Sequence, residues 1–296
     1  MRRWYVIAPP YIWLLLFFLV PFFIVLKISL SDVATAMPPY IPTYDFSEGF
    51  TGLKTFLSGL DFENYGLLFS DSLYIGSYWS SIKIAALATT LTLLVAYPIA
   101  YGMARAPKEW QATLMMLVIL PFWTSFLIRV YAWIGILKPE GLLNEFLLGM
   151  GLIKERLQIM NTTTAVYIGI VYSYLPFMIL PLYSSLEKIN PALLEAAEDL
   201  GSKPWRAFWQ VTFPLSIPGI VAGCMLVFIP AVGEFVIPDL LGGSDTLMIG
   251  KTLWKEFFDN RDWPVASAVA VLLLLVLIVP IVLFQRKQQA EREAGR

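Results

Sequence analysis

Apolar residues dominate six long stretches of the chain, and most polar residues gather between them. A helix rises about 1.5 Å per residue, so roughly 20 apolar residues cover the ~30 Å hydrocarbon layer of a bilayer. Each stretch meets that length, although the second contains Lys83 and the third contains Arg129. The pattern therefore predicts an all-α membrane protein whose six spanning helices occupy approximately residues 9–30, 75–102, 112–137, 163–186, 216–238 and 265–284.

The polar segment 187–215, between the fourth and fifth predicted spans, carries helix signals of its own. Asn190 suits the N-cap position and Pro191 suits the first turn of a helix. Gly201 can adopt the left-handed conformation that ends a helix. We expect a short exposed helix here.

A second helix is predicted to begin at Ser202 and Pro204. Its aromatic residues recur at helical spacing, which favours an amphipathic face that lies against the membrane or the helix bundle. We expect Pro214 to turn the chain into the fifth span. The aromatic face consists of Trp205, Phe208, Trp209 and Phe213.

The composition supports the membrane assignment and excludes several classes of protein. Hydrophobic residues make up 58% of the chain and charged residues 15%, which is too apolar for a soluble domain. The formal net charge of −1 gives no reason to expect nucleic-acid binding. Cys224 is the single cysteine and histidine is absent, so we expect no metal site and no histidine-dependent catalytic triad.

The distribution of charge predicts the orientation of the chain. If both termini lie in the cytoplasm, 11 basic residues lie inside and seven lie in the outer loops, as the positive-inside rule requires. The outer loops then hold 14 carboxylates and a net charge of 7 − 14 = −7. An acidic outer face concentrates cations, but acidic residues also accumulate there by default, and both interpretations stay open.

The exposed loop also carries a specific motif. Glu195, Ala196 and Ala197 are followed after three residues by Gly201, and after nine more by Val211-Thr-Phe213-Pro214. This pattern resembles the EAA loop of the permease subunits of bacterial ATP-binding cassette (ABC) importers, with Val211 and Phe213 as conservative departures. The resemblance implies a six-helix type I transmembrane domain over residues 1–296, in which Glu195, Ala196, Ala197 and Gly201 couple the chain to an ATPase.

Further stretches resemble permeases of polyamine importers of the putrescine type. They are Pro121–Trp133, Ile229–Pro238 and Asn260–Ser267. This resemblance implies a multi-pass protein of the bacterial inner membrane. Its implied partners are a homologous second permease, two ATP-binding subunits that hold ATP and magnesium, and a periplasmic polyamine-binding protein.

Nucleotide chemistry is not expected on this chain itself. Residues 243–252 end like a phosphate-binding loop, but six residues separate Gly243 from Gly250 where the motif has four. We therefore expect a non-catalytic permease subunit without a bound cofactor.

Glu234 is the acidic residue inside a predicted span, and a charge at membrane depth indicates a functional site. A polyamine needs carboxylates or aromatic faces for its ammonium groups, so Glu234 predicts a cation pathway. An ion pair between Glu234 and Arg129 or Lys83 is the alternative. The aromatic residues expected at similar depth are Tyr172, Tyr174, Phe228, Phe235 and Trp123.

Other functions remain as alternatives at this point. An importer for another cationic or amino-acid-like solute fits the same motifs. A transporter driven by an ion gradient should show inverted repeats, and an intramembrane enzyme should show a nucleophile with its base. The sequence shows neither feature clearly.

Overall fold

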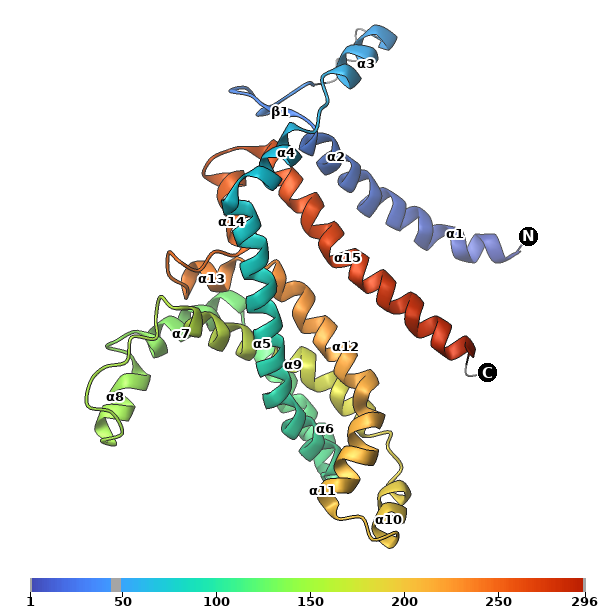
Figure 1. Ribbon diagram of the computed structural model, residues 1–296, viewed down its shortest axis with the longest axis vertical. Helices are drawn as coiled ribbons and strands as arrows, with labels where there is room; N and C mark the ends of the chain where they lie inside the picture. Colours follow the sequence, from blue (N-terminus) through green and yellow to red (C-terminus); the bar gives the residue numbers. More distant parts are fainter. Residues whose placement is uncertain (1, 44–48, 295–296) are drawn as a thin grey trace. The chain divides into compact units, whose positions relative to one another are not determined.

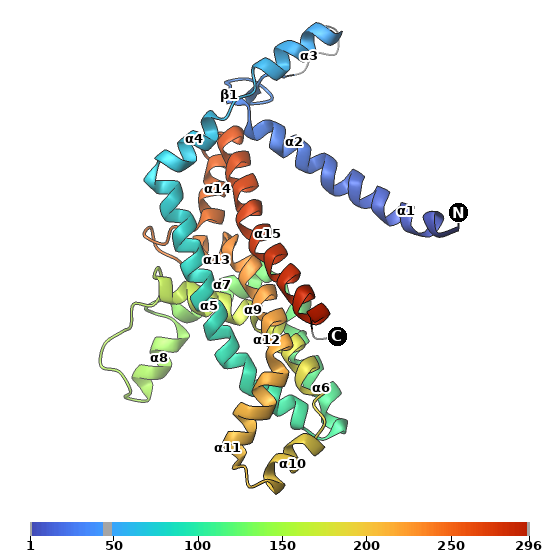
Figure 2. The same cartoon turned by 45° about the vertical axis from the view of Figure 1, so that its right-hand side comes forward.

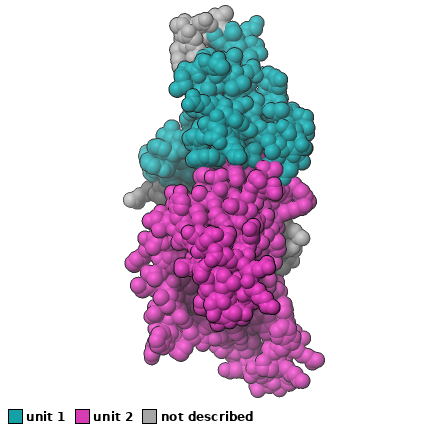
Figure 3. Space-filling view, turned by 90° about the vertical axis from the view of Figure 1, so that its left-hand side faces the viewer, with its two compact units in different colours: residues 1–77, 252–296 teal, residues 78–251 magenta. Residues whose placement is uncertain are grey.

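The computed structural model describes residues 2–43 and 49–294, which divide into two compact units. The first unit comprises residues 1–77 and 252–296, and the second comprises residues 78–251, as coloured in Figure 3. The boundaries fall inside helix α5 (Ser72–Arg105) and helix α14 (Ile249–Phe258). Each unit is described separately.

The first unit is built on two apolar helices that pack together, α2 (Val20–Ser29) and α15 (Trp263–Ala294) (Figure 1). Helix α1 (Arg2–Leu14) continues into α2 through a π-helical turn, η1 (Leu15–Leu19). Strands β1 (Asp32–Val33) and β2 (Tyr40–Ile41) pair antiparallel, with Asp32 opposite Ile41. Helices α3 (Gly49–Ser58) and α4 (Glu63–Ser70) complete this unit.

The first apolar helix exposes side chains that water would not tolerate. Only 6% of its most apolar window, within Ile7–Ser29, is buried inside the chain. Trp13, Phe17 and Phe18 are each more than half exposed. An apolar surface of this size requires lipid or a protein partner around it, so this helix belongs in a bilayer.

The second unit contains the remaining helices. Two of them, α9 (Thr163–Leu186) and α12 (Phe213–Val232), lie side by side and form its core (Figure 1). Besides parts of α5 and α14, the others are α6 (Lys108–Ile119), the 3₁₀ turn η3 (Leu120–Trp123), α7 (Phe126–Leu137), α8 (Leu142–Gly149), α10 (Ala192–Asp199), α11 (Pro204–Ala207), the π-helical turn η4 (Phe208–Thr212) and α13 (Val236–Leu240).

Two glycines allow α9 and α12 to approach closely. A Cβ atom at Gly219 would lie 2.6 Å from the Cβ of Ser185 and 2.8 Å from the carbonyl oxygen of Pro181. A Cβ atom at Gly223 would lie 2.6 Å from the Sδ of Met178. The four-residue spacing puts both glycines on one face of α12, as in other close-packed membrane helices.

The helix inventory agrees with a six-helix membrane domain. In the described part of the chain, four helices are long and apolar enough to cross a bilayer: Ile7–Ser29, Ser72–Arg105, Thr163–Leu186 and Pro204–Val232. A bent pair, Lys108–Trp123 with Phe126–Gly149, makes a fifth candidate, and Trp263–Ile278 is a shorter apolar segment. These correspond to the six predicted stretches, and the all-α prediction is confirmed.

The prediction of one continuous helix over residues 112–137 is wrong. Its two halves belong to the segments Lys108–Trp123 and Phe126–Gly149, which meet at an angle of 89°. Pro121 has no N–H to donate, and the chain leaves the helix at Thr124, whose amide and hydroxyl both donate to the carbonyl of Pro121. Because the backbone of Thr124 is extended, α7 starts in a new direction.

The fifth predicted helix, 216–238, also differs from the structure. Helix α12 ends at Val232, and α13 begins after a break at Gly233, Glu234 and Phe235. At its other end, the expected turn at Pro214 is absent, because α11, η4 and α12 form one helix from Pro204 to Val232. The π-helical turn η4 lets Phe213 N–H donate to Phe208 O, and this wider ring accommodates the proline that follows.

The glycine contact gives a testable prediction. We expect Gly219→Ala to lower the free energy of unfolding by about 1–3 kcal/mol, because its nearest neighbours include backbone that cannot move aside. The midpoint of thermal unfolding in detergent measures the effect. Gly102→Ala in α5 is the matched control, since a Cβ atom there meets nothing within 4 Å. Equal midpoints for the two variants would contradict close packing at Gly219.

Candidate functional site

The loop between α9 and α12 holds the capped helix that the sequence predicts. The Oδ1 of Asn190 accepts a hydrogen bond from the amide of Ala192 at 3.1 Å, at the start of α10. Gly201 has φ of +79°, and the amides of Gly201 and Ser202 donate to the carbonyls of Glu198 and Ala197. These two bonds form the Schellman motif that ends a helix at a left-handed residue.

Helix α10 is an exposed surface feature. Figure 1 and Figure 2 both show α10 and α11 at the end of α12 that lies away from α13. Glu195 and Ala196 are exposed, and Ala197 is half-buried. Beyond the helix, Leu200 and Trp205 are 89% and 69% exposed. Carboxylates, small residues and exposed apolar side chains together form a surface suited to another protein.

A groove runs beside this helix at the base of α9 and α12. It has a volume of about 610 Å³ and is lined by both apolar and polar residues. Leu193 of α10 and Leu215 of α12 line it together with Lys188 and Asn190. The groove therefore connects α10 directly to the two central helices.

At the other end of α12, Glu234 lies in the break before α13 and is only 8% exposed. Its Oε2 accepts a hydrogen bond from the hydroxyl of Tyr174 on α9 at 2.5 Å. Its Oε1 accepts from the amides of Val236 and Ile237 at 3.0 and 3.4 Å, at the start of α13. Three donors thus hold a buried carboxylate where the helix is interrupted.

Aromatic rings continue from Tyr174 toward α7. The rings of Tyr174 and Phe177 are 6.1 Å apart, and those of Phe177 and Phe122 are 5.0 Å apart. The guanidinium carbon of Arg129 lies 5.6 Å from the centroid of Phe122. Three rings therefore connect the carboxylate of Glu234 to the cation of Arg129.

The structure brings neither basic residue into an ion pair with Glu234. Within residues 2–43 and 49–294, no ion pair of Glu234 occurs. The Nζ of Lys83 lies 5.1 Å from the ring of Trp79. The Nε and Nη1 atoms of Arg129 are buried, with no hydrogen-bond partner in the described part of the chain. In place of the alternative ion pair, Glu234 accepts hydrogen bonds from Tyr174 and from two backbone amides.

The remaining predicted aromatic residues do not form one lining. Tyr172 lies two positions from Tyr174 and points to a different side of α9, where its ring contacts Trp133 at 5.3 Å. Both of these residues line a separate apolar pocket of about 500 Å³. Trp123 is 76% exposed, whereas Phe228 and Phe235 are half-buried.

Phe122 and Phe177 were not among the expected residues, although both extend the aromatic path from Glu234. Phe177 follows Tyr174 by three positions on α9, the spacing at which helix neighbours touch. Phe122 belongs to the 3₁₀ turn η3. The helical spacing could have identified Phe177, but the position of Phe122 depends on the bend after α6.

Comparison with known proteins relates these features to a family. A family model described as "Binding-protein-dependent transport system inner membrane component" matches residues 96–288. The spermidine/putrescine transport system permease protein PotB of Haemophilus influenzae is 40% identical over 274 residues, which cover 93% of this chain and 90% of that protein. The protein of the same name from Escherichia coli is 43% identical over 224 residues, 76% of this chain and 81% of that one.

A solved structure shares the fold. It is the bacterial alginate ABC transporter in complex with an alginate pentasaccharide-bound periplasmic protein, and the matched chain superposes with a TM-score of 0.69. The match covers 96% of this chain and 93% of that chain at 18% sequence identity. The likeness concerns the fold alone.

The bond between Tyr174 and Glu234 can be tested by stability. We expect Tyr174→Phe to lower the free energy of unfolding by about 1–3 kcal/mol, because a buried carboxylate oxygen loses its donor. A double-mutant cycle with Glu234→Gln, read by thermal unfolding in detergent, should give a coupling free energy above about 0.5 kcal/mol. Tyr131→Phe, at a tyrosine that is 58% exposed, is the control. Additive effects in the cycle would refute the interaction.

Proposed function

Because this chain belongs to the binding-protein-dependent transport system inner membrane component family, we propose that it imports putrescine or a related polyamine across the bacterial inner membrane. Its fold is that of a type I ABC-importer transmembrane domain. It is a non-catalytic, multi-pass permease subunit of an ABC transporter. The proposal extends this family assignment to the cargo, the energy source and the partners.

The observation that carries the proposal is the capped, exposed helix α10. It presents Glu195, Ala196 and Ala197 to a partner, and Gly201 closes it with a left-handed turn. We assign this surface to docking of an ATP-binding subunit. The complete importer would contain a homologous second permease, two such subunits with bound ATP and magnesium, and a periplasmic polyamine-binding protein. In this proposal both termini of the chain lie in the cytoplasm, and the excess of basic residues in the inner segments supports that orientation.

A single helix links the docking surface to the buried carboxylate. The helix Pro204–Val232 has 29 residues, or about 43 Å at 1.5 Å per residue. Movement of α10 and α11 would displace α12 relative to α9. Tyr174 belongs to α9 and Glu234 directly follows α12, so the hydrogen bond between them spans the contact that moves. ATP-driven movement at the loop would thereby open and close the site at Glu234, as alternating access requires.

The cargo assignment rests on the chemistry of Glu234. A buried carboxylate beside aromatic rings suits an ammonium group, which gains from a charged hydrogen bond and from cation–π contact. The guanidinium of Arg129 occupies the far side of the rings and repels cations from there. An anionic cargo would meet an unfavourable charge at Glu234. Similarity to the PotB proteins supports polyamines over other cationic or amino-acid-like solutes.

Coupling can be tested by reversing a charge on α10. In the complex reconstituted with its ATP-binding subunits and binding protein, we expect Glu195→Lys to abolish substrate-stimulated ATP hydrolysis, because a basic docking partner would be repelled. Glu155→Lys makes the same charge change at an exposed loop residue and should keep wild-type stimulation. Polyamine uptake that continues without ATP, driven by an ion gradient, would contradict the proposed energy source.

The role of Glu234 can be tested by uptake. We expect Glu234→Gln to reduce the rate of putrescine uptake into proteoliposomes by about tenfold or more, because the neutral amide loses the charge that attracts ammonium. The initial rate at putrescine concentrations below saturation is the measurement, and gel filtration of the complex controls for assembly. Undiminished uptake under these conditions would remove Glu234 from the pathway.

A further inference from the structure

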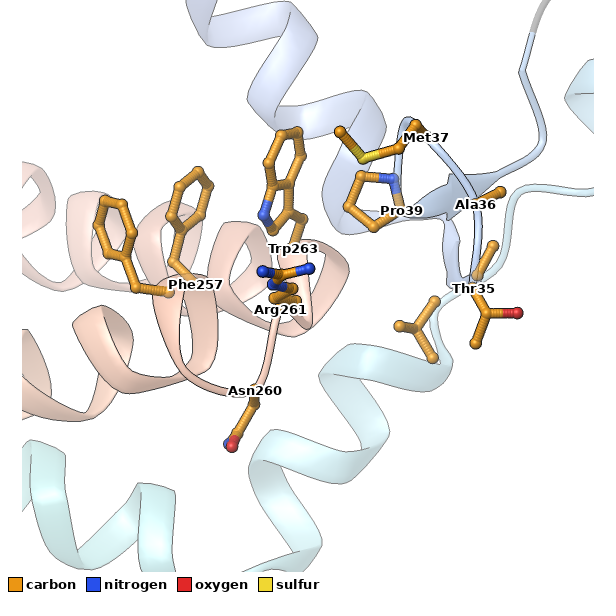
Figure 4. Close-up of a pocket in the computed structure, with 11 residues that line it drawn as sticks. Thr35, Ala36, Met37, Pro39, Phe257, Asn260, Arg261 and Trp263 are labelled. Atoms are coloured by element: carbon orange, nitrogen blue, oxygen red, sulfur yellow. The ribbon is translucent and has the colours of Figure 1, made fainter.

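The first unit contains a cleft whose lining residues belong neither to the coupling helix nor to the surroundings of Glu234. It has a volume of about 980 Å³ and two walls, which Figure 4 shows facing each other. One wall is the loop between β1 and β2, including Thr35, Met37 and Pro39. The other is the turn between α14 and α15, with Phe257, Phe258, Asn260, Arg261 and Trp263.

Both walls are held in place by contacts of their own. In the hairpin loop, the amide of Ala34 donates to the carbonyl of Pro39 at 3.2 Å. In the turn, the Nδ2 of Asn260 donates to the buried carboxylate of Glu256 at 2.8 Å. The rings of Phe257 and Trp263 stack 5.0 Å apart. The cleft is therefore preformed, which lowers the entropy cost of binding a partner.

The rim of the cleft exposes apolar side chains. Met37 is 92% exposed, Val33 is 56% exposed and Phe258 is 53% exposed. The proposed orientation places this rim on the outer side of the membrane, in water. An apolar patch around a preformed cleft marks an interaction site, and methionine adapts well to a partner's surface.

Arg261 supplies the one charge among the residues that line the cleft. Its φ of 56° lies in the left-handed region, an uncommon conformation for a bulky side chain, and such strain often marks function. Among the described residues, no carboxylate lies within ion-pair distance of Arg261.

The neighbouring Asp262 bonds to the start of α15 and not to Arg261: its Oδ1 accepts a hydrogen bond from the amide of Val265 at 3.0 Å. Burial, reinforced by the nearby charge of Glu256, raises the pKa of this carboxyl group, although the bond from Val265 acts in the opposite direction. As far as residues 2–43 and 49–294 are concerned, the guanidinium of Arg261 is thus available to an acidic group of a partner.

We propose that this cleft docks a loop of the periplasmic solute-binding protein that carries a carboxylate next to an apolar side chain. The carboxylate pairs with Arg261, and the apolar side chain packs between Met37 and the aromatic wall. A free polyamine is disfavoured because Arg261 repels it. This assignment rests on the proposed function, which supplies both the outer location and the partner.

The test uses the complete transporter in nanodiscs of zwitterionic lipid, titrated with the binding protein loaded with putrescine. Stimulated ATP hydrolysis gives the half-saturating concentration of the binding protein. We expect Arg261→Glu to raise it by about tenfold or more, and Arg261→Asn to raise it by about threefold to tenfold. Asparagine tolerates the left-handed backbone, so the second variant removes the charge without added strain.

Two further variants complete the design. Met37→Ser should raise the half-saturating concentration by a few fold, since this side chain is too exposed to matter for folding. Lys154→Glu, at an exposed loop residue of the second unit, is the matched charge reversal and should behave as wild type. For the cleft variants, recovery of the maximal rate at saturating binding protein separates weaker docking from misfolding.

The outcomes are distinct. An unchanged half-saturating concentration in Arg261→Glu overturns the docking site, as does an effect of equal size in Lys154→Glu. If Arg261 instead holds a lipid headgroup, its variants change how the thermal stability of the complex depends on anionic lipid. The titration with the binding protein is then unaffected, which also overturns the proposal. Failure of the proposed function looks different, because no binding protein then stimulates the wild-type complex.

Discussion

A bilayer offers no hydrogen-bond partners, so every interruption of a spanning helix in this chain must be satisfied by the chain itself. The two main interruptions meet this constraint in different ways. At the bend after α6, the carbonyl of Pro121 accepts from both the amide and the hydroxyl of Thr124. After α12, the carboxylate of Glu234 accepts the first amides of α13. The second solution buries a carboxylate where the helix is interrupted, and that carboxylate is the most distinctive chemical feature of the second unit.

The same constraint applies to α12, the helix on which the proposed mechanism depends. The helix is continuous from Pro204 to Val232, because the π-helical turn η4 accommodates Pro214 without ending the helix. Its close contact with α9 depends on Gly219 and Gly223, and α9 carries Tyr174, the side-chain donor to Glu234. A continuous helix, a close helix contact and a buried hydrogen bond are thereby arranged along one pair of helices.

Local signals in the sequence were sufficient wherever the determining contacts are also local. The cap at Asn190 and the left-handed turn at Gly201 involve residues within one helical turn of each other, and the structure contains both. The apolar stretches located the helices but not their breaks, since a run of about 20 apolar residues has few stable arrangements other than a membrane helix. Proline was less informative, because Pro121 ends a helix whereas Pro214 is accommodated within one.

The sequence by itself determined the membrane environment, the approximate helices and the motif that indicates the family, because these depend on composition and on short spacings. Tertiary structure decided the partner of Glu234, which is Tyr174 and not Arg129 or Lys83. It also decided that Phe122 and Phe177 connect Glu234 to Arg129, and that the β1–β2 loop faces the turn before α15. These contacts join residues far apart in the chain, and their geometry follows from helix directions and bends that no local pattern encodes.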